Sequence, residues 1–419
     1  MFSGLFNGAD GRIRTGGLVP SLQNHEIVIH VDRESGSIYN MGSGACQYSP
    51  LETAFLRFQI VRAQGARNGK WGRRMANVTI EDVARLAGVS RMTVSRVINS
   101  NGYVKQETEK KVTDAIEQLG YRPNMLAKSL VTKKSKTLAY VMINISDPFH
   151  NLVSKGIESV AYRKQYITFL CDTHSRQREE DYINMFMDNR IGGAIFHHLS
   201  ITEAQIKRMS DNGVKCVLMD NETDLDNVST VNSDNYAGGK LAGEYLVSKG
   251  HQRIGVIHPP LKPISNPNIP YENTFQFKMW RDRTRGFTDA LHAANLEPVA
   301  FYETLVRFEY AKLTMADIVN NVLASPIKIS ALYCEDDIMA FGVMDELWKH
   351  GVRVPDDIAI IGHDGLDMCH MVHPYLTTVS QPRYEMGRYA GEMLINEIEG
   401  DSEPKTVTLQ PTLIPGETV

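Results

Sequence analysis

The feature that most constrains the fold of this chain is an alternation that runs from residue 138 to residue 364. Short runs rich in β-branched and other apolar residues recur there, separated by stretches with helical periodicity. Near-continuous apolar strands that alternate with helices are typical of parallel sheets with both faces covered. Eight such strands predict two doubly wound α/β lobes in place of a single sheet. The runs are LAYVMINI (138–145), YITFLCDT (166–173), GGAIFHHL (192–199), VKCVLMD (214–220), RIGVIHP (253–259), PVAFYETL (298–305), ISALYCED (329–336) and DIAIIGHD (357–364).

Acidic residues stand where several of these runs end. Ligands of doubly wound folds bind beyond the carboxyl ends of the strands, so we expect ligand contacts at these positions. The aspartates near predicted strand ends are Asp147, Asp172, Asp220, Asp336 and Asp364.

A second pattern, three short amphipathic helices, precedes the lobes. The first is expected to start after the N-cap Thr79 and to end at Gly88. The second begins after Ser90, and the third covers about residues 106–119. Two helices joined by a tight Gly-Val-Ser turn predict a helix-turn-helix. The side chains that the second helix turns away from its apolar face are Arg91, Met92, Ser95 and Arg96.

Two other segments have less structure of their own. Residues 124–130 are helix-competent but fall short of the roughly 12 to 15 residues that a marginally stable isolated helix needs, so we expect them to fold only against a partner. Residues 131–136 are expected to form a basic linker. Residues 1–74 show no sustained period, and we interpret them as a disordered extension or as a mis-assigned start of the reading frame.

The charge of the chain is unevenly distributed. Its 45 Lys and Arg against 49 Asp and Glu give a net charge of −4, but the first 136 residues carry +9, so the remainder carries −13. Basic residues around the helix pair favour a polyanionic partner. A helix pair that only packs or binds protein is the alternative.

Several other classes of protein are not expected. The five cysteines are odd in number and lack a CxxC pair, which argues against a disulfide framework or zinc site and fits a reducing cytoplasm. No run approaches the ~18 apolar residues of a membrane-spanning helix. No GxSxG elbow, phosphate loop or GxGxxG fingerprint follows a predicted strand, so we expect no catalytic residue and no cofactor. His363, Asp364, His370 and His373 could suggest a metal cluster, but their placement does not favour one, and we expect no metal.

Seven motifs occur in one order along residues 77–419. They are VTIEDVARLAGVSRMTVSRVINSNGYV (78–104), LGYRPNMLAKSL (119–130), DPF (147–149), GHQRIGVI (250–257), EDDIMAFGVM (335–344), VRVPDDIAIIGHD (352–364) and LTTVSQP (376–382). In these motifs the chain resembles the lactose and galactose repressor (LacI/GalR) family of bacterial transcription regulators. The resemblance implies a homodimer that binds a palindromic operator in double-stranded DNA under the control of a small ligand.

This resemblance divides the chain into four parts. They are an extension (1–75), an all-α helix-turn-helix DNA-binding domain (76–122), a hinge helix with its linker (123–136), and a two-lobed, periplasmic-binding-protein-like effector and dimerisation domain (137–419).

The outward residues of the second helix coincide with the family's specificity positions. Arg can donate two hydrogen bonds to guanine and Met can contact a thymine methyl, so base contacts are expected at Arg91, Met92 and Arg96. The resemblance implies that a leucine at the position of Leu130 enters the minor groove as a wedge, whereas by itself Leu130 would be interpreted as a core residue. Phosphate contacts or caps are expected at Ser90, Thr93, Ser95 and Asn99, and further DNA contacts at Thr79, Tyr121, Asn124 and Lys128.

The same resemblance implies an effector site. Asp336 and Asp364 would accept hydrogen bonds from hydroxyl groups of the ligand. The guanidinium of Arg283 would donate two parallel hydrogen bonds to it. Arg281 and Arg285 flank Arg283, so a shift of two residues would move that role. The remaining contacts are expected at Phe149, His150, Phe308 and Gln381.

Two departures from the common family pattern bear on the effector. The loop 262–280 is longer, and Glu335 precedes Asp336 and Asp337 where the family more usually has a neutral residue. The added acid favours a polyhydroxy or cationic effector over a carboxylate.

The sequence therefore predicts a cytoplasmic, ligand-responsive repressor of carbohydrate-utilisation genes with a sugar-like effector. The competing hypothesis is a two-lobed solute-binding protein or carbohydrate enzyme without a DNA role. That hypothesis requires an export signal or catalytic residues, and we identify neither. The sequence leaves open the effector, the operator, the sign of regulation, and dimer against tetramer.

Overall fold

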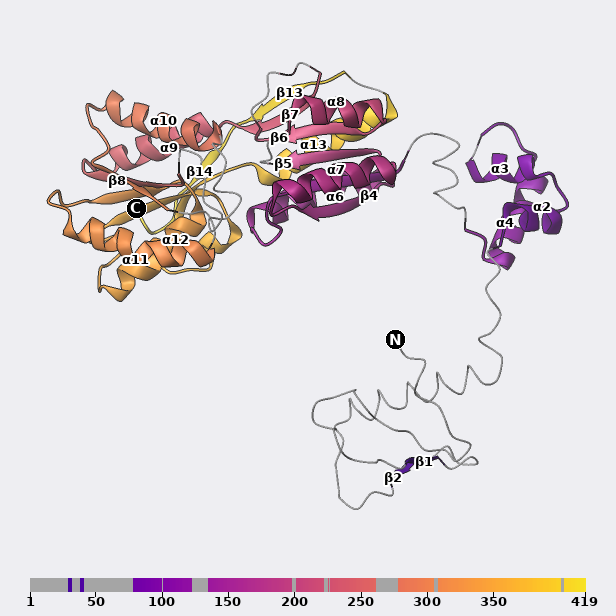
Figure 1. Ribbon diagram of the computed structural model, residues 1–419, viewed down its shortest axis with the longest axis horizontal. Helices are drawn as coiled ribbons and strands as arrows, with labels where there is room; N and C mark the ends of the chain where they lie inside the picture. The colour runs from indigo at the N-terminus through magenta and orange to yellow at the C-terminus, as the bar shows by residue number, and fades with distance from the viewer. Residues whose placement is uncertain are drawn as a thin grey trace. The chain divides into compact units, whose positions relative to one another are not determined.

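The computed structural model describes most of the chain in two compact units, Met1–Pro123 and Asn124–Val419 (Figure 1). At 29–31, 38–40, 99 and 308–313 it describes the backbone alone. The described residues are 29–31, 38–40, 78–99, 101–122, 135–197, 201–221, 225, 227–260, 278–304, 308–400 and 403–419.

The part of the first unit that the structure describes contains three helices around a small core. They are α2 (Ile80–Ala87), α3 (Arg91–Asn99) and α4 (Gln106–Leu119). Thr79 caps α2 in a capping box with Asp82, and Gly88 ends it in the left-handed conformation at φ 65°. The three predicted helices and these two ends are confirmed. The core is formed by Val83, Ala84, Val94, Val112 and Ala115.

A pair of short strands lies earlier in the same unit. Strand β1 (Ile29–Val31) pairs antiparallel with β2 (Ile38–Asn40). No period in the sequence predicted this pair.

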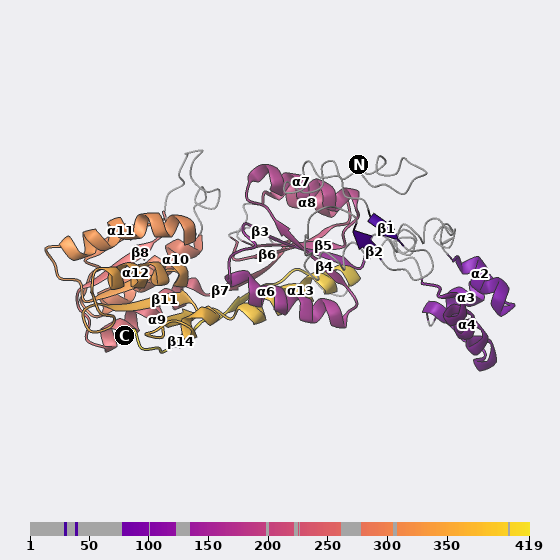
Figure 2. The ribbon, with the colours of Figure 1, turned by 90° about the horizontal axis from the view of Figure 1, so that it is seen from below.

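The second unit holds two six-stranded sheets, which confirm the predicted pair of doubly wound lobes. In the first lobe the strand order is β13-β7-β6-β5-β3-β4, and all strands are parallel. Figure 2 shows α7 and α8 on one side of this sheet and α6 and α13 on the other. The elements are β3 (Thr137–Met142), α6 (Phe149–Arg163), β4 (Ile167–Asp172), α7 (Arg176–Asp188), β5 (Gly193–His197), α8 (Glu203–Asp211), β6 (Lys215–Met219), β7 (Ser229–Ser233), α13 (Arg383–Glu399) and β13 (Thr406–Leu409).

The second lobe repeats this plan in the order β14-β12-β11-β10-β8-β9. Its strands are parallel except for the edge strand β14, which is antiparallel to β12. The elements are α9 (Asn235–Ser248), β8 (Ile254–His258), α10 (Lys278–Ala293), β9 (Ala300–Glu303), α11 (Phe308–Ala324), β10 (Ala331–Cys334), α12 (Asp337–Lys349), β11 (Ala359–Asp364), the 3₁₀ helix η3 (Asp367–His370), β12 (Thr377–Ser380) and β14 (Thr412–Ile414).

All eight predicted strands are present, each shorter than its apolar run. Strands β7, β12, β13 and β14 were not predicted, because sequences such as STVNS and TTVS are short and rich in hydroxyl side chains. These four strands flank the three passages between the lobes: β7 to α9, β12 to α13, and β13 to β14.

Each lobe has one helix pair whose backbones touch through glycines. A Cβ on Gly387 of α13 would lie 2.0 Å from the carbonyl oxygen of Val153, and one on Gly156 of α6 would lie 2.1 Å from that of Tyr384. Helices α9 and α10 meet in the same way, because a Cβ on Gly239 would lie 2.0 Å from the carbonyl oxygen of Arg283. Only glycine permits these approaches, and they fix how closely the two helices of each pair lie.

Among the described helices, none combines the length and apolar character that crossing a lipid bilayer requires.

Candidate functional site

The exposed face of α3 carries the three predicted base-contacting side chains. Met92 is 65% exposed, and Arg91 and Arg96 are exposed beside it. The Arg91 guanidinium pairs with the Glu81 carboxylate of α2 at 3.1 Å, and Nη2 of Arg96 lies 3.7 Å from the Met92 sulfur. The face therefore presents two cations and a polarisable thioether on one short helix.

The other predicted DNA contacts near α3 have varied surroundings. The Ser90 hydroxyl accepts a hydrogen bond from the backbone N–H of Thr93 at 3.1 Å, which is the geometry of an N-cap. Ser95 is half-buried, and Tyr121 packs against the three-helix core. Asn99 is described in its backbone only, and the predicted contacts Asn124, Lys128 and Leu130 lie outside the described residues.

The second site is built around Asp364, the last residue of β11. Its Oδ1 accepts from Nε2 of Gln381 at 2.6 Å and pairs with Nη2 of Arg283 at 3.2 Å. Asp364 has a φ of 111°, so the backbone is held in a conformation that L-residues rarely adopt. Three predicted effector residues from β11, α10 and the passage after β12 thus form one hydrogen-bonded group.

Arg283 is the fixed centre of this group. Only 1% of it is exposed, and Nε donates to Oδ1 of Asn235 at 2.8 Å while Nη1 donates to the carbonyl oxygen of Glu335. Burial is the largest single effect and opposes its ionisation, but the acidic groups around it, Asp364 foremost, together outweigh burial, and the pKa of Arg283 lies above its usual value. Arg285, by contrast, is exposed and pairs with Asp282. The buried guanidinium is that of Arg283, as predicted.

The three consecutive acids after β10 have different surroundings. Asp336 caps α12, because its Oδ1 accepts from the N–H of Ile338 at 2.6 Å. Asp337 accepts from Leu366 N–H, the Cys369 thiol and the Thr378 hydroxyl, and so anchors the loop that follows Asp364. Burial is the largest cause that raises the pKa of each: that of Asp336 rises well above its usual value, and that of Asp337 to about 7.

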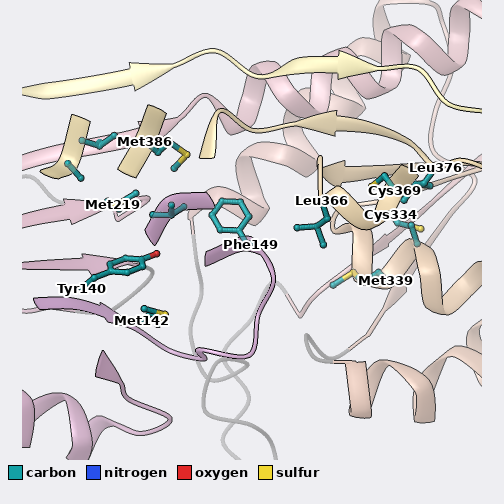
Figure 3. Close-up of a cluster of buried hydrophobic side chains, with 14 of the residues drawn as sticks. Tyr140, Met142, Phe149, Met219, Cys334, Met339, Leu366, Cys369, Leu376 and Met386 are labelled. Atoms are coloured by element: carbon teal, nitrogen blue, oxygen red, sulfur yellow. The ribbon is translucent and has the colours of Figure 1, made fainter. Parts of the chain in front are cut away.

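The first lobe contributes Phe149 and His150 from the start of α6. The Tyr140 hydroxyl lies 2.8 Å from Nδ1 of His150 and 2.7 Å from Nδ1 of His197, and all three side chains are buried. Figure 3 shows Phe149 between first-lobe side chains such as Tyr140 and second-lobe side chains such as Leu366. Phe308 begins α11, but its side chain lies outside the described residues.

Two residues of this site escaped the sequence analysis. Asn235 follows β7 and binds Arg283; Arg383 follows β12, donates to the carbonyl oxygen of Gly365, and lies 5.9 Å from the ring centre of Phe149. Both follow strands that were not predicted. Had those strands been recognised, the rule of ligand contacts at strand ends would have indicated both residues.

The end of the first lobe nearest the linker carries a separate ionic cluster. The Glu399 carboxylate at the end of α13 binds Nζ of Lys136 at 3.1 Å and Nζ of Lys164 at 3.4 Å. The ammonium of Lys136 also lies 4.0 Å from the ring centre of Tyr166. The hydrogen bond from Lys136 is the main cause that lowers the pKa of Glu399. Helices α6 and α13 therefore begin at predicted effector residues or beside them and end near Lys136, the residue that precedes β3.

A helix-turn-helix unit with an exposed cationic helix, in one chain with a two-lobed unit that gathers polar side chains at its strand ends, defines the class of ligand-responsive DNA-binding regulators. Residues 79–124 match the model of bacterial regulatory proteins of the lacI family, and residues 244–419 match that of the periplasmic binding protein-like domain. The transcriptional repressor PurR of Vibrio campbellii is 31% identical over 345 residues, which cover 81% of this chain and 98% of that repressor. PurR of Actinobacillus pleuropneumoniae is 30% identical over 340 residues, or 80% of this chain and 96% of that repressor. The chain belongs to the LacI family of transcriptional repressors.

Solved structures agree with this fold. The regulator CelR in complex with cellobiose is 26% identical, with a TM-score of 0.59 over 82% of this chain and all of that one. A LacI-type regulator of Alkaliphilus metalliredigens in complex with D-xylulofuranose is 30% identical, with a TM-score of 0.58 over 68% and 99%. The lac repressor dimer bound to operator and an anti-inducer is 23% identical, with a TM-score of 0.69 over 81% and 98%, and shows the shared fold. Because the curated relatives are transcriptional repressors, the alternative of an enzyme or a stand-alone solute-binding protein is set aside.

Proposed function

We propose that this protein is a homodimeric, sugar-controlled repressor that acts on a two-fold symmetric operator in the cytoplasm. The observation that carries the proposal is the presence in one chain of the exposed Arg91, Met92 and Arg96 face and the buried group around Asp364. The first can enter a major groove, and the second can hold a polyhydroxy ligand.

The base contacts follow from the geometry of α3. Arg96 lies on the same helix face as Met92, one turn away, so a guanine contact and a thymine-methyl contact would fall on nearby base pairs. Arg91 must exchange its partner Glu81 for the DNA, and because both side chains are exposed this exchange costs little.

The effector is proposed to bind at Asp364, Arg283 and Gln381, with Phe149 and His150 from the other lobe. Support comes from the burial of these side chains at the strand ends, and from the cellobiose and D-xylulofuranose carried by the structural neighbours. The ligand must bind two states of the lobes with different affinity in order to shift operator binding.

The dimer is proposed to form across the edge of the first sheet. Strand β4 ends that sheet and exposes three large apolar side chains: Ile167 (63%), Phe169 (48%) and Leu170 (48%). An exposed apolar edge strand favours association, and a second copy of the chain would cover it.

In vitro selection from random duplexes with the purified full chain tests the DNA role. We expect enrichment of a two-fold symmetric sequence, which the protein binds with an affinity that falls steeply with salt as phosphate contacts release counterions. Arg96→Ala should weaken binding by about 1 to 3 kcal/mol and relax the preference at one base pair per half-site. Lys110→Ala on α4 is the matched surface control. Failure to enrich any sequence, or binding unaffected by salt, would refute the proposal.

A further inference from the structure

Glu335 differs from the other buried acids of the second lobe in its hydrogen bonds. It follows β10 directly, is 0% exposed, and its Oε1 accepts from the Thr284 hydroxyl of α10 at 2.5 Å. In the described part of the chain its other oxygen, Oε2, has no hydrogen-bond partner. A buried carboxyl oxygen without a donor is costly, so a donor supplied from outside the chain would be strongly favoured there.

Glu335 lies next to residues that we propose to bind the effector. Its own carbonyl oxygen accepts from Nη1 of Arg283, whose Nη2 pairs with Asp364, and the next residue is Asp336. Thr284, which holds Oε1, is the residue after Arg283 on α10. Consecutive residues of α10 thus hold the Glu335 carboxyl and supply Arg283, and these residues with Asp336 and Asp364 form one wall of the proposed effector site.

The charges of this wall are unbalanced. Glu335, Asp336, Asp337 and Asp364 are all buried. Two buried guanidiniums face them: Arg283 pairs with Asp364, and Arg383 donates to the Gly365 carbonyl oxygen and pairs with Asp367. The Asp337 carboxyl accepts hydrogen bonds from three donors of the chain. The Asp336 carboxyl accepts from backbone N–H groups at the start of α12. An anionic ligand would oppose the ionisation of these acids, whereas a cationic ligand would favour it.

We propose that Glu335 is a specificity-determining contact and that the effector carries an ammonium group, as an amino sugar does, which donates to Oε2. The inference rests on the proposed function, because it places this group in the same effector site. A charge-assisted hydrogen bond to a buried carboxylate should make the amine bind about tenfold to a hundredfold more tightly than its hydroxyl counterpart.

Binding should also move a proton. Burial raises the pKa of Glu335 to about 8, so the free protein holds the carboxyl largely protonated at pH 7. The charged and titratable groups around it are Arg283 on α10, and Tyr333 and Cys334 on β10. An ammonium beside the carboxyl favours its ionised form, and the proton passes to the buffer.

The test is calorimetric titration of the full chain with matched ligands: D-glucosamine against D-glucose, D-galactosamine against D-galactose, and D-mannosamine against D-mannose. We expect at least one amine to bind about tenfold more tightly than its partner, with an enthalpy at pH 7 that differs between phosphate and Tris buffers because a proton is released. In Glu335→Gln the preference and the proton release should disappear. In Glu297→Gln, the same change at an exposed acid of the same lobe, both should persist.

Three results would overturn the inference: no amine binds, neutral sugars bind as tightly as amines, or Glu335→Gln keeps the preference. Binding of neutral sugars that is lost in Asp364→Ala would leave the proposed function standing while the inference fails. The buffer comparison uses the unaltered protein, so the inference stays testable even if Glu335→Gln does not fold.

Discussion

Replacement of Arg283 by methionine should destabilise the second lobe strongly. The substitution keeps the apolar stem but removes the ion pair with Asp364 and the hydrogen bonds to Asn235 and to the Glu335 carbonyl oxygen. Asp364 would remain buried and would keep the hydrogen bond from Gln381. Breaking a buried pair by removing one partner costs about 3 to 5 kcal/mol, because a charge is left uncompensated.

Urea unfolding of the full chain measures this effect. Trp280, whose ring centre lies 4.7 Å from the Arg283 guanidinium, reports on the lobe by fluorescence. Arg285→Met, on the exposed side of the same helix, should change the free energy of unfolding by less than about 0.5 kcal/mol. Adding Asp364→Asn to Arg283→Met should recover about 1 to 3 kcal/mol relative to the sum of the single changes. A loss below about 1 kcal/mol for Arg283→Met, or strict additivity in the double variant, would refute the reasoning.

Three further predictions concern packing, protonation and assembly. Gly387→Ala should lower the free energy of unfolding in urea by about 1 to 3 kcal/mol, because its Cβ would meet the Val153 carbonyl oxygen at 2.0 Å. Gly391→Ala, whose Cβ has its nearest contact at 3.4 Å, should be tolerated. Equal effects of the two changes would contradict the tight approach of the helices. The folded chain holds a proton on Glu335 up to a pKa of about 8, whereas the unfolded chain releases it near 4.5, so this group's stabilisation is full below pH 4.5 and falls until pH 8. Glu335→Gln should therefore flatten the decline of Tm between pH 5 and pH 8, and parallel curves would count against it. Phe169→Glu on β4 should shift the sedimentation coefficient from dimer to monomer, and an unchanged dimer would exclude this edge as the interface.

The sequence predicted best what local periodicity determines. The three helices of the first unit and the eight apolar strands were found because burial on one or both faces leaves a readable pattern. Strands such as β12 were missed because their threonine side chains are buried through hydrogen bonds, which leave no hydrophobic signal. The Thr377 hydroxyl accepts from the Gly416 N–H, and the Thr378 hydroxyl donates to Asp337. Whether a polar side chain is buried depends on contacts that are distant along the chain.

The residues around Asp364 show the same limit. Motif resemblance indicated Arg283, Asp364 and Gln381, and the structure brings these three together. It gave no indication of Asn235, because that contact depends on where α9 and α10 meet. It also could not show that Oδ1 of Asp336 is engaged in capping a helix.

The glycine contact between α6 and α13 should make these two helices move together as one rigid body. With 17 residues, α13 is about 25 Å long, and its backbone touches that of α6 at Gly156 and Gly387, so one helix cannot slide without the other. A tilt of about 5° imposed at the Arg383 end would carry the Glu399 end about 2 Å, which is enough to part a salt bridge. With the effector at the proposed site, the pair would pass a small movement at Arg383 on as a larger one at Lys136, from which the chain leads back to the DNA-binding helices.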